Sequence, residues 1–261
     1  MNVRLIRHAT LQLEIGGRRL LVDPMLDPAG ARPPVANTPN ARPNPLVALP
    51  EPAEQVVAWT EAVLVTHLHA DHLDAEADRL IGDRLPVLCQ PGDAETLAGR
   101  GLTDLLPVGD RVEWGGLTIS RTGGRHGTGE IADRLGPVSG FVVDDGESRV
   151  YVAGDTVWCD EVERALAEHA PDVVIVNAGG ARFLEGYPNT MDAGDVLAVR
   201  AAAPEATLIA VHLEAINHCL ETRSDLSAAT AAAEVVIPAD GQVVEVRRRG
   251  AGGAGSSAMP R

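Results

Sequence analysis

Val63-Leu64-Val65-Thr66-His67-Leu68-His69-Ala70-Asp71-His72-Leu73-Asp74 is the stretch of sequence that decides the fold. Its first residues are apolar or β-branched, which is typical of a buried strand, and they run directly into the pattern His-x-His-x-Asp-His. Imidazole and carboxylate are natural ligands of zinc and similar divalent ions. A turn at a strand end lets neighbouring side chains converge. The pattern therefore predicts a metal site, against the alternative of surface histidines in a polar loop.

The part of this stretch from Thr66 to His72 resembles the signature of the metallo-β-lactamase superfamily. The resemblance implies a set of ligands for two divalent ions: His67, His69 and His126 for the first ion, Asp71, His72 and His212 for the second, and Asp155 as the bridge between them. Taken alone, each of three residues would more often be structural or solvated: His126, Asp155 and His212. Their order and their positions at the ends of predicted strands favour ligation.

Other segments resemble the UlaG-like branch, which includes ascorbate-6-phosphate lactonase. They are Arg7-His8-Ala9-Thr10, the Gly16-Gly17 turn, Leu21-Val22-Asp23-Pro24 and Thr190-Met191-Asp192-Ala193-Gly194-Asp195. By this resemblance Asp23 supports the metal ligands. His8 either supports them or simply packs, and we favour packing. The chain has neither the helical C-terminal extension of glyoxalase II nor a flavodoxin domain, so we do not expect glyoxalase II or flavodiiron activity.

The order of the predicted elements indicates the fold class. We predict strands at 3–6, 11–15, 20–22, 62–66, 86–89, 139–144, 149–153, 172–176, 207–211 and 242–247, and a hairpin at 111–122. Predicted helices cover 53–60, 75–81, 94–101, 161–170, 192–203 and 225–234, the last capped by Ser224. Both halves, about 1–125 and 126–249, begin with strands and then alternate strand and helix. This order predicts one α/β (α+β) domain over 1–249, a four-layer αββα sandwich of two mixed sheets with helices outside.

Two segments fall outside this pattern. Residues 24–52 are rich in proline, asparagine and alanine without periodicity, and we favour a lid over the pocket rather than a disordered segment. Residues 250–261 are rich in glycine and serine, so we predict a disordered tail.

Composition limits the classes of protein and partner. The chain has 261 residues, 45% of them apolar, which is enough for a sizeable core. Its apolar runs are too short for a membrane helix, and its three cysteines show no CxxC spacing, which fits a reducing compartment. The net charge of −15 repels a nucleic-acid backbone on average. We expect a cytoplasmic protein with a small-molecule substrate and no nucleic-acid or membrane partner, and homo-oligomerisation stays open.

Four residues are candidates for contact with the substrate. His218 could donate a proton to a leaving group or hold a substrate oxygen, with a hydrogen-bonded loop histidine as the alternative. Arg182 and Arg223 are candidate anchors for a carboxylate or phosphate, although such arginines are more often surface residues. Asn177 follows a predicted strand at the same sheet edge as the ligands, where it would line the pocket.

The predicted ligand set indicates hydrolysis. Two divalent ions, with zinc expected first and manganese or iron also acceptable, would share a water whose pKa falls to about 7. Asp71 would orient the resulting hydroxide or carry its proton. We therefore predict a lactonase- or esterase-like hydrolase of a small ester or lactone, including sugar-derived or phosphorylated compounds. The alternatives are a phosphodiesterase of the same fold, and a non-hydrolytic metal-dependent oxygenase or sensor.

Overall fold

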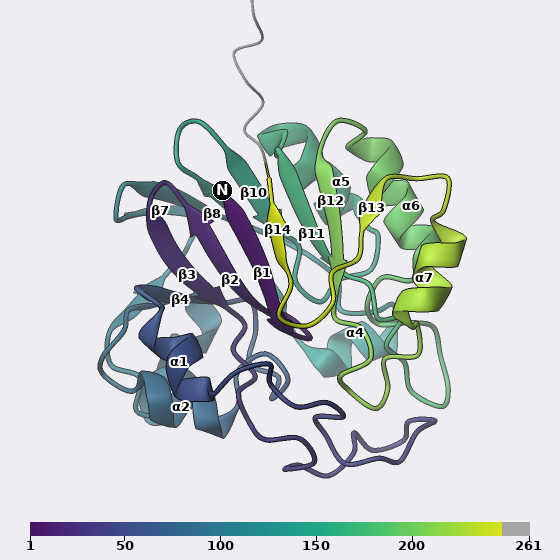
Figure 1. Cartoon of the computed structure of the whole chain (residues 1–261), viewed down its shortest axis with the longest axis horizontal. Coiled ribbons are helices and arrows are strands. Elements are labelled where there is room, and N and C mark those ends of the chain that lie inside the picture. Colours follow the sequence, from purple (N-terminus) through teal and green to yellow (C-terminus); the bar gives the residue numbers. More distant parts are fainter. Residues whose placement is uncertain (247–261) are drawn as a thin grey trace, which may run out of the picture.

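The computed structural model describes residues 1–246, which form two seven-stranded sheets packed face to face (Figure 1). The first sheet has the order β14-β1-β2-β3-β4-β5-β6. Its strands are β1 (Asn2–Arg7), β2 (Thr10–Ile15), β3 (Arg18–Val22), β4 (Ala62–Val65), β5 (Val87–Cys89), β6 (Leu105–Pro107) and β14 (Val243–Glu245). It is antiparallel from β14 to β3 and parallel from β3 to β6.

The second sheet has the order β13-β12-β11-β10-β9-β8-β7. Its strands are β7 (Arg111–Trp114), β8 (Leu117–Thr122), β9 (Gly140–Asp144), β10 (Arg149–Val152), β11 (Val173–Asn177), β12 (Thr207–Val211) and β13 (Val235–Val236). It is antiparallel from β7 to β10 and parallel from β10 to β13. The chain crosses from the first sheet to the second after β6. That the two halves, about 1–125 and 126–249, are similar to each other stays a prediction.

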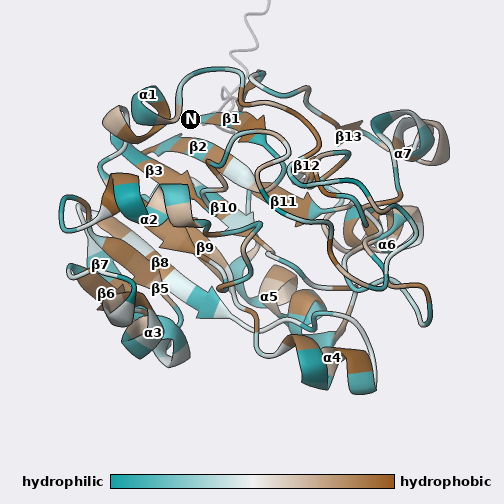
Figure 2. Ribbon diagram, turned by 90° about the horizontal axis from the view of Figure 1, so that it is seen from below, coloured by the Kyte–Doolittle hydropathy of each residue, from teal (hydrophilic) through white to brown (hydrophobic). Residues whose placement is uncertain are grey.

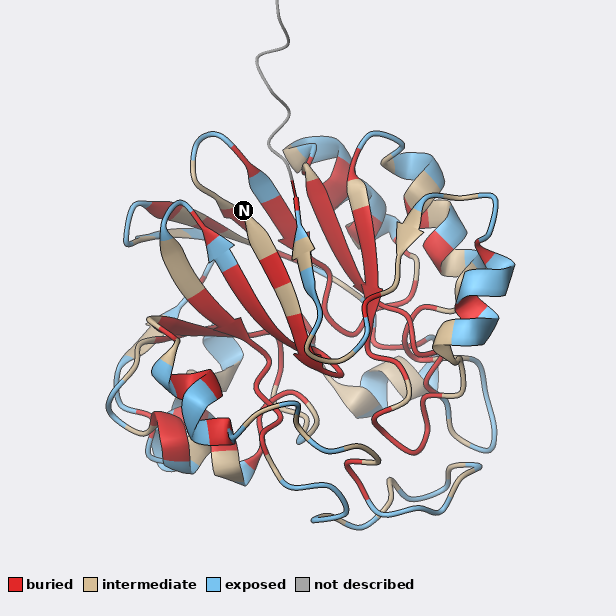
Figure 3. Cartoon of the chain, viewed as in Figure 1, coloured by how far each residue is buried: buried red, intermediate tan, exposed pale blue. Residues whose placement is uncertain are grey.

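Alternation along the strands explains the layers. In β10, Val150 and Val152 belong to the cluster between the two sheets, while Tyr151 faces the helices outside. In β4, Leu64 points between the sheets and Val63 points outward. Successive side chains of a strand point to opposite faces. Because both faces of these strands are covered, one by the other sheet and one by helices, nearly every residue along them is apolar. The buried strands lie in the middle of the molecule (Figure 3).

Helices cover both outer faces, which confirms the predicted αββα sandwich. The first sheet is covered by α1 (Ala53–Ala58), α2 (Ala75–Ile81) and α3 (Ala94–Gly99), the last preceded by the short 3-10 helix η1 (Pro91–Asp93). The second sheet is covered by α5 (Asp160–His169), α6 (Ala193–Ala202) and α7 (Arg223–Ala229). Hydrophobic and hydrophilic residues alternate along these helices (Figure 2), and buried residues such as Leu80 of α2 and Val199 of α6 pack against the sheets.

Several boundaries differ from the sequence-based prediction. Helix α7 begins at Arg223, and its cap is Thr222 rather than Ser224, because the hydroxyl of Thr222 accepts a hydrogen bond from the backbone N–H of Asp225 and closes a capping box. The prediction missed β6, β13 and α4 (Glu130–Leu135), which are short, and α4 buries none of its side chains. The predicted disordered tail lies outside the described residues.

The segment 24–52 has no regular element beyond a single bridge between Arg32 and Asn44. Its base is fixed by Arg7, whose fully buried guanidinium donates hydrogen bonds to the carbonyl oxygens of Met25, Asp27 and Val47 at 2.7, 3.0 and 2.9 Å. Burial lowers the pKa of Arg7 to about 10.

The middle of this segment is bound to the loop after β12. Asn44 and Asn217 exchange hydrogen bonds, with Asn44 Nδ2 donating to Asn217 Oδ1 at 2.7 Å and the Asn217 backbone N–H donating to Asn44 Oδ1 at 2.9 Å. The segment is therefore anchored at its base and at its middle.

Within residues 1–246, no helix is long and apolar enough to cross a membrane.

Candidate metal site

The predicted metal ligands lie just beyond strand ends at one edge of the sandwich. β4 ends two residues before His67, β10 ends three residues before Asp155, and β12 ends one residue before His212. β3 and β4 are parallel in the first sheet, and β10, β11 and β12 are parallel in the second. The 3.2 Å contact between His72 Nε2 and Asp155 Oδ2 places the carboxyl ends of β4 and β10 at the same edge of the sandwich. Ligands in functional sites of α/β folds commonly gather at that edge.

Three residues at this edge have left-handed backbone conformations. The φ angles of His8, Asp23 and His212 are 60°, 44° and 69°. Non-glycine residues rarely adopt this region, and each instance costs of order 1–3 kcal/mol, so such strain persists where the surrounding structure enforces it. Each of the three directly follows a strand, where the left-handed turn brings its side chain over the sheet edge.

One group of ligands comprises His67, His69 and His126, which could hold a metal ion. Nε2 of His67 lies 3.0 Å from Nδ1 of His69, and Nε2 of His126 lies 3.3 Å from the same Nδ1. His67 and His126 are buried, and His69 is half-buried. The far nitrogen of His126 contacts the carbonyl oxygen of Asn189 at 2.8 Å, which orients the ring and leaves Nε2 directed at the group.

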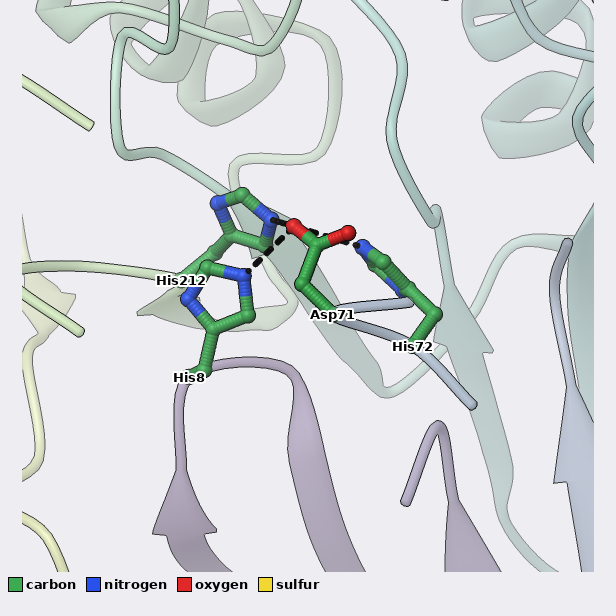
Figure 4. Close-up of side chains that lie close together, drawn as sticks. All are labelled: His8, Asp71, His72 and His212. Atoms are coloured by element: carbon green, nitrogen blue, oxygen red, sulfur yellow. Dashed lines mark hydrogen bonds and ion pairs between the residues drawn. The ribbon is translucent and has the colours of Figure 1, made fainter. Parts of the chain in front are cut away.

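A second group contains Asp71, His72 and His212 together with His8 (Figure 4). Oδ2 of Asp71 lies 3.8 Å from Nε2 of His212 and 4.0 Å from Nε2 of His72. Nε2 of His8 lies 3.1 Å from the same oxygen. His8 was expected to pack, and this contact with a predicted ligand favours the alternative that it supports the metal ligands.

Asp155 lies between the two groups. Its Oδ2 is 3.2 Å from His72 Nε2 and 3.5 Å from His126 Nε2, and its Oδ1 is 3.2 Å from His212 Nε2. The Nε2 atoms of His72 and His212 are buried and make no hydrogen bond of acceptable geometry. Buried polar atoms without partners are costly, and imidazole nitrogens that converge on carboxylates fit a divalent cation. The donor set is thus suited to metal binding.

Hydrogen bonds behind the ligands hold them in place. Nδ1 of His72 lies 2.8 Å from Oδ2 of Asp23, and Asp23 also accepts hydrogen bonds from the backbone and hydroxyl of Thr66 at 2.8 and 2.7 Å. Asn177 donates a hydrogen bond to Oδ1 of Asp155 at 2.7 Å. Asp23 thus lies behind His72, as predicted for a residue that supports the ligands. Such a partner fixes the tautomer and the direction of a ligating histidine.

Burial and charge set the protonation of the ligands. Burial lowers the pKa of His67 and of His212 well below the ordinary value, so both rings are neutral and carry a lone pair at neutral pH. Burial alone would raise the pKa of Asp155, but its close approach to the His212 and His72 rings holds it well below its usual range. The site therefore presents an ionised carboxylate among imidazoles.

A cavity of about 380 Å³ opens onto the site. Four predicted ligands line it: His69, Asp71, His126 and Asp155. The remaining lining residues are Arg32, Pro33, Val35, Asn44, Ala70, Leu135, Phe183, Asn189, Ile216 and His218. Residues of the segment 24–52 thus form one wall, which agrees with the predicted lid. The walls away from the ligands are mainly apolar.

The four predicted substrate contacts have different positions. His218 lines the cavity, its Nδ1 is buried without a hydrogen-bond partner, and burial lowers its pKa. Arg182, Arg223 and Asn177 are not among the lining residues. Arg182 is exposed, and Arg223 pairs with Glu214 and Asp240. The role of these three in substrate binding stays a prediction that the geometry does not favour.

Comparison with known proteins establishes the family. A family model described as a Beta-lactamase superfamily domain matches residues 18–213. The UPF0173 protein YddR of Bacillus subtilis (strain 168) is 32% identical over 250 residues, which cover 93% of this chain and 98% of YddR. The chain belongs to the UPF0173 family of the metallo-β-lactamase superfamily. A UPF0173 metal-dependent hydrolase of Azorhizobium caulinodans is 27% identical and is covered over its full length. The chain is thus a metal-dependent hydrolase, and its family implies a small-molecule substrate.

Two solved structures resemble this UPF0173 chain along most of its length. The isothiocyanate hydrolase from Delia radicum gut bacteria is 34% identical, with a TM-score of 0.89, and the match covers 94% of this chain and 99% of that chain. A possible metal-dependent hydrolase from Veillonella parvula DSM 2008 is 32% identical, with a TM-score of 0.90 and the same coverage.

Arg32 and Phe183 of the UPF0173 cavity were not predicted from the sequence, and His8 was expected to pack. His8 directly follows β1, so the strand-end rule that identified His212 applies equally to it. Arg32 and Phe183 reach the cavity from irregular segments, where no periodicity indicates which side chains point inward. They depend on tertiary contacts that no local pattern encodes.

Proposed function

We propose that this chain uses two divalent metal ions, zinc first among them, to hydrolyse a small, neutral, apolar-substituted electrophile at a carbon atom, with organic isothiocyanates as the leading substrate class. The observation that carries this proposal is an apolar cavity that ends on the ligand groups. Support for the substrate class comes from the whole-length similarity to an isothiocyanate hydrolase.

The ligand groups divide between two positions in this proposal. His67, His69 and His126 would hold the first ion, Asp71, His72 and His212 the second, and Asp155 would contact both. Bound ions would supply a hydroxide at neutral pH and polarise the bond that it attacks.

The remaining chemistry belongs to side chains of the cavity. Asp71 lines the cavity with an ionised carboxylate and orients the attacking water. His218 stands at the cavity wall and passes a proton to the leaving atom. For an isothiocyanate, water oxygen adds to the central carbon, the carbon–nitrogen bond breaks, and both water protons end on nitrogen. The products are an amine and carbonyl sulfide, which balances the reaction.

The walls of the cavity favour a neutral substrate. Pro33, Val35, Phe183 and Ile216 provide apolar surface for a hydrocarbon substituent. Arg32 is the only arginine among the lining residues, and its Nε pairs with Asp27 at 2.9 Å. Apart from the bound ions themselves, the cavity wall offers little cationic charge for the other oxygens of a phosphate, which favours a neutral substrate over a phosphodiester.

A small ester or lactone is the second candidate class. It is favoured by the resemblance of segments such as Arg7-His8-Ala9-Thr10 to the UlaG-like branch, and it requires the same attack at a neutral carbon. The two classes differ in the leaving atom, which is nitrogen in an isothiocyanate and oxygen in a lactone.

The test compares three substrates with one zinc-loaded preparation: phenethyl isothiocyanate, a γ-lactone and bis-p-nitrophenyl phosphate. We expect amine release from the isothiocyanate, and its loss in His67→Ala and His126→Ala together with reduced metal content. Turnover of the lactone alone would select the second class. Turnover of the phosphodiester alone would refute both.

A further inference from the structure

His8 is a fully buried histidine that lies among the ligands of the second group without belonging to the predicted set (Figure 4). We propose that His8 is a positioning residue that holds Asp71 and His212 in the geometry that retains the second ion. This inference rests on the proposed two-ion site and adds a residue to it.

The contact with Asp71 carries the first part of the inference. His8 Nε2 lies 3.1 Å from Oδ2 of Asp71, the carboxylate oxygen that faces His72 and His212. Within residues 1–246, His8 is the only hydrogen-bond partner of this carboxylate. Of the second group, Asp71 alone lines the cavity, where solvent and substrate reach it. Its direction therefore depends on the hydrogen bond from His8.

The contact with His212 carries the second part. The ring centroids of His8 and His212 are 3.6 Å apart, with an angle of 36° between the ring planes. The backbone N–H of His212 also donates a hydrogen bond to the carbonyl oxygen of His8 at 2.9 Å. His8, which follows β1, thus contacts both the ring and the backbone of His212, which follows β12.

The hydrogen-bonding pattern favours donation to Asp71 over direct metal ligation. If Nε2 carries the proton and donates it to Asp71, the buried Nδ1 is left as an acceptor without a partner. If Nε2 bound a metal instead, Nδ1 would carry the proton and become a buried donor without an acceptor. Unsatisfied buried donors are rarer than under-satisfied acceptors. His8 therefore acts through Asp71 in this proposal.

The experiment compares full-length wild type, His8→Ala and His8→Gln, each loaded with cobalt(II) and dialysed against graded concentrations of a chelator. Metal content is measured by mass spectrometry, and the cobalt absorption spectrum reports the environment of each ion. Alanine and glutamine share the backbone cost at a φ of 60°, so comparing the two variants cancels most of it. The thermal midpoint of each protein checks that it folds.

We expect His8→Ala to bind the second ion 10–100-fold more weakly and to keep the first, because loss of a partner behind a ligand typically has that effect. The amide of His8→Gln places an N–H near the position of Nε2, so it should restore most of the second-ion affinity. Two retained ions in both variants would reduce His8 to packing and overturn the proposal. Equal loss of the second ion in both variants would make His8 a ligand or a folding determinant, which also overturns it. A wild type with fewer than two ions would refute the proposed site itself and this inference with it.

Discussion

Asn177 donates its hydrogen bond to Oδ1 of Asp155, the same oxygen that lies 3.2 Å from Nε2 of His212. The amide fixes the rotation of the carboxylate that stands between the two ligand groups. We expect Asn177→Ala to weaken metal binding 10–100-fold by freeing that rotation. Metal content after dialysis against a chelator measures the effect.

Asn189→Ala is the matched control for that change. Asn189 is buried beside the site, but it contacts His126 through its backbone carbonyl, which alanine retains. Metal content should therefore stay at the wild-type level. Equal metal loss in both variants would contradict a specific role for the Asn177 amide.

The metal-free protein should lose stability as the pH falls below about 6.5. Burial holds the pKa of His67 and of His212 below the unfolded value of about 6.5, so the unfolded chain binds more protons in this range. Each such histidine contributes stability that is present above pH 6.5 and is lost progressively at about 1.4 kcal/mol per pH unit below it. Urea unfolding at pH 6.5 and pH 5.5, repeated with His67→Gln, checks the sign, because the raised pKa of His72 acts in the opposite direction mainly above this range. A steeper slope in the variant would contradict the assignment.

Chelation of the loaded protein should lower the thermal midpoint and abolish hydrolysis. A ligand that binds only the folded state stabilises it by about 4 kcal/mol when its free concentration is 1,000 times its Kd. Scanning calorimetry with and without chelator, followed by addition of zinc, measures the loss and its recovery. If the chelated protein is shown to be metal-free and its thermal midpoint equals that of the loaded protein, the metal does not connect ligands from the two sheets.

His218→Gln should lower kcat/KM about 100-fold or more while metal content stays unchanged, because His218 lines the cavity without being a predicted ligand. Burial lowers the pKa of His218, so the ring is neutral at pH 7 and takes up its proton only in more acidic solution. The wild-type rate profile should change below pH 6.5 at a step that the variant lacks. An identical profile in both proteins would remove His218 from proton transfer.

Two arginine variants distinguish a contact with the substrate from a structural contact. Arg32→Ala should raise KM, because Arg32 lines the cavity. Arg223→Ala should leave KM unchanged and lower the free energy of unfolding by about 1 kcal/mol, because its guanidinium pairs with Glu214 and Asp240 near the surface. Steady-state kinetics and urea unfolding of both variants test the pair, and a raised KM in Arg223→Ala would restore its predicted role in substrate binding.

The sequence predicted the fold where periodicity is strong. Buried strands such as β4 and β12 are continuous apolar runs that end in chemically distinctive residues, so both the strand and the residue after it were identified. Short elements such as β13 and α4 were not, because two to six residues carry too little pattern. Helix α7 was predicted to start two residues late, because Thr222 and Ser224 both suit a cap and only the position of Asp225 decides between them, and it ends at Ala229, five residues before the predicted end.

The fold brings the predicted ligands together, whereas it does not bring the predicted arginines to the cavity. Each predicted ligand after the histidine-rich turn follows a strand, so the fold itself brings them together. Arg182 and Arg223 were selected for their chemistry alone, and tertiary contacts direct Arg223 elsewhere. Asn177 was placed at the correct sheet edge, but its amide points to Asp155.

Arg7 attaches the segment 24–52 to the sandwich by hydrogen bonds to its backbone rather than to its side chains. It pins both ends of the segment 24–52 through three carbonyl oxygens, and backbone atoms are present whatever the side chains are. Changing the side chains of Arg32, Pro33 or Val35 would therefore alter the wall of the cavity and leave these three hydrogen bonds in place.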